Sequence, residues 1–127
     1  MIGYVTVGTN NVPRGQAFYD ALLGELGATR IFADAKYTFY GIDWQQPMVA
    51  VCAPFDGNPA VVGNGAMVAL QCPDRATVDR VHARALALGG ADEGAPGLRE
   101  PQDMHFYGAY FRDLDGNKFC AFKMGAE

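Results

Sequence analysis

The sequence has few residues of the kinds that bind metals, and it has no cluster of positive charge. Its 127 residues include only 2 histidines, 3 cysteines and 1 tryptophan, and 14 acidic residues outnumber its 10 lysines and arginines. With a net charge of -4, the chain lacks the electrostatic footprint of a protein that binds nucleic acid or an anionic membrane. We therefore expect neither partner.

Long apolar runs are also missing. No segment approaches the roughly 18 consecutive apolar residues of a membrane-spanning helix, and the N-terminal MIGYVTVGTNN has no basic stretch followed by an apolar run. Cys52, Cys72 and Cys120 are odd in number and widely spaced, which fits neither a disulfide framework nor a CxxC motif. We expect a cytoplasmic protein with reduced cysteines.

The remaining composition is that of a folded chain. Half of the residues are hydrophobic and 19% are charged, a balance that permits a packed core. The length fits one ordinary domain of about 100 to 150 residues. We predict a single domain over residues 1–127.

The chain contains a degenerate internal repeat, and such repeats indicate how a fold is organised. A shift of 63 residues places YVTVGTNN, which begins at Tyr4, on MVALQCPD, which begins at Met67. Later in each half the shift becomes 70, which places Tyr40 on Tyr110 and Asp43 on Asp113. The change predicts a loop in the second half that is longer by about seven residues than its counterpart.

Each half begins with a short apolar run that leads into a helix. Asn11 and Asp74 are natural N-cap residues, and apolar residues follow each of them at three- and four-residue steps. After each helix, runs rich in aromatic and β-branched residues predict strands. The predicted strands cover 29–33, 36–42 and 47–52 in the first half, and 91–94, 105–111 and 118–122 in the second.

This order of elements predicts an α+β fold of two tandem β-α-β-β-β modules. The modules cover residues 1–56 and 64–127, and a linker rich in glycine, proline and asparagine joins them. Because pairing two such units hides a strand edge, we expect their sheets to join into one curved mixed sheet around a cleft, with the helices on the outer face. That concave, helix-free face is the expected ligand site.

Three motifs resemble those of the vicinal-oxygen-chelate superfamily, which includes glyoxalases, bleomycin-resistance proteins and extradiol dioxygenases. They are YVTVGTNN from Tyr4 with Phe18 and Tyr19 after it, GAMVALQCPD over 65–74, and YFRDLDGN over 110–117. The last is close to the Asp-Pro-Asp-Gly-Asn turn of the family, with leucine in place of proline. The resemblance covers essentially the whole chain and implies the same two-module fold.

The resemblance also implies four positions where metal-using members keep their ligands. Those positions are Tyr4, Ala50, Met67 and Cys120. A divalent metal of this family requires imidazole and carboxylate ligands, and none of the four residues supplies either. We therefore expect no metal site and no cofactor.

Aromatic and sulfur-containing side chains dominate the expected cleft. The residues expected to bind the ligand are Tyr4, Trp44, Ala50, Met67, Tyr107, Tyr110 and Cys120. A cleft with phenol and sulfur groups but no charge favours a planar or apolar organic ligand over an anion.

Three residues are weak candidates for catalysis, namely Tyr4, His105 and Cys120. A thiolate at Cys120 could act as a nucleophile, but a cysteine between apolar neighbours more often packs as a small core residue. His105 could act as an acid or base, or it could be a polar strand end that faces water. His82 is expected at the surface or edge of the second helix, away from His105.

Asp113 and Asp115 form a carboxylate pair that could serve acid-base chemistry or bind calcium. In the sequence Asp-Leu-Asp-Gly-Asn they more plausibly shape a turn, because aspartate and asparagine bond to nearby backbone N–H groups.

The favoured hypothesis for the whole chain is metal-independent binding of a small organic molecule, as in bleomycin-binding proteins. The alternative is a lyase, isomerase or dioxygenase-like enzyme with displaced metal ligands or with metal-free catalysis.

The assembly is the last expectation. The resemblance implies a homodimer, and the strand edges that paired units leave open also need covering.

Overall fold

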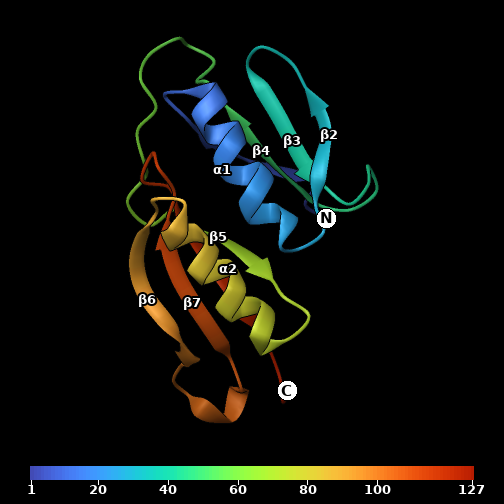
Figure 1. The fold of residues 1–127 in the computed structure, drawn as a ribbon, viewed down its shortest axis with the longest axis vertical. Helices are drawn as coiled ribbons and strands as arrows, with labels where there is room; N and C mark the ends of the chain where they lie inside the picture. The colour runs from blue at the N-terminus through green and yellow to red at the C-terminus, as the bar shows by residue number, and fades with distance from the viewer.

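The computed structural model describes residues 1–127, except for the side chain of Gln102, and it has the predicted α+β fold (Figure 1). Two β-α-β-β-β modules follow each other along the chain, and no regular element lies between residues 53 and 67. The first module contains β1 (Tyr4–Gly8), α1 (Val12–Gly24), β2 (Thr29–Ala33), β3 (Tyr37–Gly41) and β4 (Met48–Cys52). The second contains β5 (Val68–Gln71), α2 (Arg75–Ala87), β6 (Ala91–Leu98), a short 3-10 helix (Gln102–Met104), β7 (Tyr107–Arg112) and β8 (Lys118–Lys123).

The strands form two four-stranded mixed sheets, in place of the one continuous sheet that we expected. Their orders are β1-β4-β3-β2 and β5-β8-β7-β6, so each module repeats the same topology. In each sheet the first strand pairs in parallel with the last, and the other pairs are antiparallel. Both helices lie on the same side of the sheets, in front of them in Figure 1. The other faces of both sheets are therefore free of helices.

Strand pairing confirms the repeat for the first and last strands of each module. Thr6 pairs with Ala50 in the first module, and Ala69 pairs with Cys120 in the second. These two pairs are related by the predicted shifts of 63 and 70 residues.

The predicted shift is wrong by one residue for β3 and β7. Tyr40 pairs with Val49, and the equivalent pair in the second module is Phe111 with Phe119. Tyr40 therefore corresponds to Phe111 and not to Tyr110, a shift of 71 residues. A slip of one residue moves every side chain of a strand to the opposite face. The slip changes which aromatic residues can reach the cleft.

The helices begin where the sequence predicted. The side chain of Asn11 accepts a hydrogen bond from the Arg14 amide at 3.0 Å, and that of Asp74 accepts one from the Thr77 amide at 2.8 Å. Side-chain caps of this kind satisfy backbone N–H groups that have no partner within the helix. No helix in the part of the chain that the structure describes is long and apolar enough to cross a membrane.

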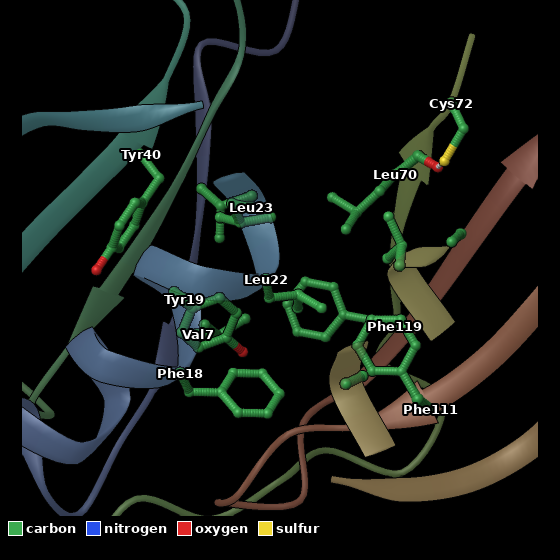
Figure 2. Close-up of a cluster of buried hydrophobic side chains, with 14 of the residues drawn as sticks. Val7, Phe18, Tyr19, Leu22, Leu23, Tyr40, Leu70, Cys72, Phe111 and Phe119 are labelled. Carbon is green, nitrogen blue, oxygen red and sulfur yellow. Dashed lines mark hydrogen bonds between the residues drawn. The ribbon is translucent and has the colours of Figure 1, made fainter. Parts of the chain in front are cut away.

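One apolar core extends through both modules. Phe18, Tyr19 and Leu22 of α1 pack near Phe111 and Phe119 of the second sheet (Figure 2). The rings of Tyr19 and Phe119 lie 5.8 Å apart, and those of Phe111 and Phe119 are stacked. Side chains of α2 complete the cluster; they include Val78, Val81 and Ala85. The two modules therefore share one hydrophobic interior.

Polar contacts also join the modules, and they are made by the turn of residues 113–117. Asp113 accepts a hydrogen bond from the hydroxyl of Tyr19, which lies on α1. The side-chain amide of Asn117 donates to the carbonyl of Gly8 at 2.8 Å, and Asp115 accepts from the amide of Asn10 at 2.9 Å. We call this set of contacts the inter-module clasp.

Candidate functional site

The helix-free face of the first sheet carries a cluster of aromatic rings. Thr6, Phe39 and Ala50 lie side by side across three strands, so their side chains point to the same face. The rings of Tyr4 and Phe39 meet edge to face at 4.9 Å, and those of Phe32 and Tyr37 lie 6.1 and 6.3 Å from Phe39. Because this cluster covers the sheet, Ala50 is fully buried.

A hollow of about 360 Å³ opens beside this cluster. It is lined by Tyr4, Phe39, Trp44, Met48 and neighbouring residues of the two adjoining loops, none of which is charged. Tyr4 is 53% exposed, and Trp44 is also exposed. Large exposed aromatic side chains around a concavity are typical of a surface that binds an apolar partner. We call this concavity the aromatic hollow.

The helix-free face of the second sheet has different chemistry. Tyr110 and Cys120 pair across β7 and β8, with Ala69 next to Cys120. The guanidinium of Arg99 lies 5.3 Å from the centre of the Tyr110 ring, and the ammonium of Lys118 lies 5.6 Å from it. Both distances are within the range of cation–π interactions.

A second hollow, of about 470 Å³, lies at one end of this face. Its lining includes Val62, Met67, Arg112 and Lys118 together with residues 63–66. We call it the basic hollow. The expectation of a cleft without charge is wrong for this module, because alternate residues of a strand share a face: Arg112 follows Tyr110 by two positions, and Lys118 precedes Cys120 by two.

The predicted ligand-binding residues do not meet in one place within the chain. Tyr4 and Trp44 line the aromatic hollow, whereas Met67 lines the basic hollow. Tyr107 is a correction: its hydroxyl donates to Asp79 of α2 at 2.7 Å, so it lies on the helix-covered face. The reason is strand alternation: Tyr107 and Tyr110 are three positions apart in β7, so their side chains point to opposite faces.

Cys120 is buried, as the packing interpretation requires. It is only 1% exposed, and burial raises the pKa of its thiol, although the nearby hydroxyl of Tyr110 and the charges of Arg99 and Lys118 act in the opposite direction. Burial also raises the pKa of Cys72, to about 11. A thiol with a raised pKa is largely protonated at neutral pH and is a poor nucleophile.

The two histidines lie in different environments. His105 is exposed in the turn before β7, where its φ is 53°, and its carbonyl accepts from the Gly125 amide. His82 was expected at the surface, but it is buried between α2 and β6, where its ring bonds to Asp92 at 3.0 Å. The backbone amide of Gly94 and the ring of His82 both lower the pKa of Asp92.

The carboxylates of the 113–117 turn act as predicted. One oxygen of Asp113 accepts from the amides of Asp115 and Asn117 at 2.9 and 2.8 Å, and Gly116 has a φ of 91°. The turn interpretation is confirmed, and the clasp contacts add a second role that the sequence did not reveal.

Comparison with solved structures shows the family of the chain. A glyoxalase/bleomycin resistance protein from Albidiferax ferrireducens is 36% identical, with a TM-score of 0.87, over 97% of this chain and 98% of that one. The chain belongs to the glyoxalase/bleomycin-resistance family of the vicinal-oxygen-chelate superfamily.

More distant structures have the same fold. A glyoxalase/bleomycin resistance protein/dioxygenase family enzyme from Burkholderia phytofirmans is 16% identical, with a TM-score of 0.75 over 97% of this chain and 98% of that one. A lactoylglutathione lyase from Agrobacterium tumefaciens is 19% identical, with a TM-score of 0.69 over 97% and 92%. A scan against family models and a search of curated proteins found no match.

The four metal-ligand positions of this glyoxalase-like protein do not fit a divalent metal. Ala50 has no ligand atom, and Met67 offers only a thioether. Cys120 is buried with a raised thiol pKa, and the ring of Tyr4 packs against Phe39. A divalent metal requires several imidazole, carboxylate or thiolate donors that point to one place. Among the described residues, no group of three or more histidine, cysteine or acidic side chains is placed to hold a metal ion.

The sequence analysis missed the charged residues on the helix-free face of the second sheet. Lys118 and Arg112 could have been found from strand alternation, since each lies two residues from an expected cleft residue. Phe39 could have been found once the register of β3 was known. Arg99 lies in the segment after β6, and its position over Tyr110 has no signal in the sequence.

Proposed function

We propose that this glyoxalase-like protein binds a small organic molecule on the helix-free faces of its sheets, without a metal. The observation that carries the proposal is the aromatic hollow. Exposed Tyr4 and Trp44 surround it, and it opens where the resemblance places the ligand cleft. Aromatic rings give a planar ligand a large contact area and offset stacking, each pair contributing about 0.5–1.5 kcal/mol beyond the buried area.

The floor of the first sheet supports binding without a metal. At Ala50, where the family resemblance implies a metal ligand, the side chain is a methyl group covered by the aromatic cluster around Phe39. A metal brought to this place would meet apolar side chains in the first module and a buried thiol in the second. Metal chemistry would therefore require donors that neither sheet face presents at these positions.

The single tryptophan of the chain provides a direct test. Trp44 lines the aromatic hollow, so a ligand that binds there should change the tryptophan fluorescence of the protein. We expect some members of a series of planar aromatic compounds to quench or shift this fluorescence saturably in the presence of EDTA. A binding isotherm that is unchanged by EDTA supports the proposal, whereas binding that disappears with EDTA and returns with a divalent metal contradicts it.

Phe39 and Phe55 give a matched pair of variants for that test. Phe39 is at the centre of the aromatic cluster, whereas Phe55 is an exposed ring in the segment between the modules. We expect Phe39→Leu to weaken binding about tenfold, because the variant loses one aromatic contact and leaves a small cavity beside the ligand. We expect Phe55→Leu to leave binding unchanged. Equal effects of the two variants would show that the compounds bind elsewhere.

We also propose that the protein forms a homodimer. Within one chain, the two four-stranded sheets leave strand edges at β1, β2, β5 and β6. Large apolar side chains are exposed as well, among them Ile2, Tyr4, Trp44 and Met67. A second copy could cover both kinds of surface. Sedimentation at micromolar concentration tests this: a species of twice the chain mass supports a dimer, and a stable monomer contradicts it.

A further inference from the structure

We propose that the basic hollow of the second module binds the anionic group of a small organic acid, with Lys118 as the main contact. The inference rests on the proposed function, because it assumes that ligands bind on the helix-free faces. It adds the chemical class of the ligand: a carboxylate or sulfonate attached to an apolar body.

Charge in and around the hollow is the first argument. Arg112 is already paired with Glu93, and its guanidinium also donates to the carbonyl of Gly116 at 2.9 Å. Lys118 and Arg99 take part in none of the ion pairs of the described residues. Two cations without a carboxylate partner therefore lie on one sheet face of a chain whose net charge is -4. Such a local excess of positive charge attracts anions.

The second argument is that Arg99 is held in place. Its guanidinium donates to the carbonyls of Ala95 and Gly97 at 2.6 and 3.0 Å, and it lies over the ring of Tyr110. A Cβ at Gly94 would come within 3.1 Å of the Tyr110 ring and 3.3 Å of Arg99, so the glycine leaves the space in which these two side chains pack. A cation fixed by its own hydrogen bonds loses little entropy when an anion approaches, and it adds to the field at Lys118.

The third argument is the apolar lining next to Lys118. Met67 is 46% exposed in the same hollow, and Val62 is exposed beside it. A volume of about 470 Å³ is within the range of pockets that hold small organic molecules. The ligand body can contact Met67 and Val62 while its anionic group meets the ammonium of Lys118. Neither an inorganic anion nor a purely apolar compound uses both halves of this lining.

Three probes of the same shape and different charge test the inference. They are 2-naphthoate, 2-naphthamide and 2-naphthylmethylammonium, measured by calorimetric titration in low-salt buffer with EDTA. We expect naphthoate to bind about tenfold more tightly than the amide, because hydrogen bonds to charged groups are the stronger ones, and the ammonium to bind most weakly. Raising the salt concentration should reduce the naphthoate preference, because salt screens exposed charges.

Lys118→Met removes the charge but keeps a long side chain, and Lys36→Met is its control. Lys36 also places its ammonium over an aromatic ring, that of Phe55 at 5.9 Å, but it lies in the first module. We expect Lys118→Met to reduce naphthoate affinity to that of the amide and Lys36→Met to leave it unchanged. Arg99→Gln should give a smaller loss in the same direction. Thermal melting of each variant shows whether it is folded, and Lys118→Gln replaces Lys118→Met if that protein does not fold.

The outcomes separate this inference from the proposed function. Equal affinity for all three probes, or a naphthoate preference that survives in both Lys118 variants, overturns the organic-anion inference and leaves small-molecule binding intact. Failure of all three probes and of the Trp44 series to bind overturns both. A naphthoate preference that disappears in Lys118→Met and persists in Lys36→Met supports both.

Discussion

The two modules share one backbone plan but present different chemistry on the same sheet face. In the first module that face carries Tyr4, Phe39 and Trp44 around a hollow whose lining is uncharged. In the second it carries Lys118 and Arg112 around a hollow of similar size. Equivalent strands pair in equivalent registers, so the repeat preserves the positions of side chains and not their chemistry. At equivalent positions of this face, Phe39 corresponds to Tyr110 and Ala50 to Cys120, so the same backbone positions carry different side chains in the two modules.

The modules also differ in their turns, and this difference gives the largest expected effect. Asp113 is only 6% exposed and accepts hydrogen bonds from Tyr19, Asn117 and backbone amides, whereas exposed Asp43 bonds the amide of Gln45. We expect Asp113→Ala to lower the free energy of unfolding by about 3 kcal/mol, because it leaves several buried donors without a partner. Asp43→Ala should cost less than about 1 kcal/mol.

Urea denaturation of both variants measures this difference. Similar losses of unfolding free energy in Asp113→Ala and Asp43→Ala would show that the inter-module clasp contributes no more to stability than an exposed turn does.

Tyr19 and Tyr40 allow a contact between the modules to be compared with a contact inside one module. Burial, and then the neighbouring Asp113, raises the pKa of Tyr19 well above its usual value of 10. Burial and the hydrogen bond to Asp20, which lies in the same module, raise the pKa of Tyr40. Because the folded state holds these protons more tightly than the unfolded state, their stabilisation is complete below pH 10 and is lost as the pH rises through the folded pKa values.

We therefore expect unfolding free energy to fall steeply above about pH 10, and Tyr19→Phe and Tyr40→Phe each to make that fall less steep. At pH 8, Tyr19→Phe should lose about 1–2 kcal/mol, because Asp113 loses a hydrogen-bond donor in a buried place. Urea melts across pH 8 to 11 give both quantities. Identical pH slopes for wild type and both variants would contradict the assignment.

The smallest expected effect comes from making the second module resemble the first at one position. Cys120 and Ala50 are equivalent in register, so Cys120→Ala gives both modules the same floor residue. We expect a stability loss of about 1 kcal/mol, typical of a small buried truncation, and no change in ligand binding. In the wild type, alkylation of the Cys120 thiol should be slow at neutral pH, because the thiol is buried and its pKa is raised. Loss of binding or activity in this variant would favour thiolate chemistry.

Much of this fold could be predicted from the sequence because its signals are local. Asn11 and Asp74 cap their helices as predicted, and alternation and turn residues located the strands. The register of β7 could not be obtained in this way. Aligning identical residues places Tyr40 on Tyr110, whereas the strand pairing shows that the residue equivalent to Tyr40 is Phe111. Tyr107 faces α2 because it is three positions from Tyr110 in the same strand.

The candidate site was predicted less completely, for a physical reason. The positions of Tyr4, Ala50, Met67 and Cys120 are those that the family resemblance implies, but their neighbours depend on tertiary packing. His82 was expected at the surface, and its burial against β6 depends on a contact with Asp92 that no local pattern encodes. The position of Arg99 over Tyr110 depends in the same way on the conformation of the segment around Gly97.

Metal content tests the central claim most directly, namely that this member of the superfamily binds its ligand without a chelated metal. Untagged protein should be isolated, then incubated with Zn²⁺, Ni²⁺, Mn²⁺ or Fe²⁺, freed of unbound ions and analysed by plasma mass spectrometry, with thermal melting alongside. We expect far less than one metal ion per chain in every sample and no metal-dependent rise in melting temperature. One ion per chain, accompanied by a rise in melting temperature that is lost when Tyr4 or Cys120 is replaced by alanine, would contradict the claim.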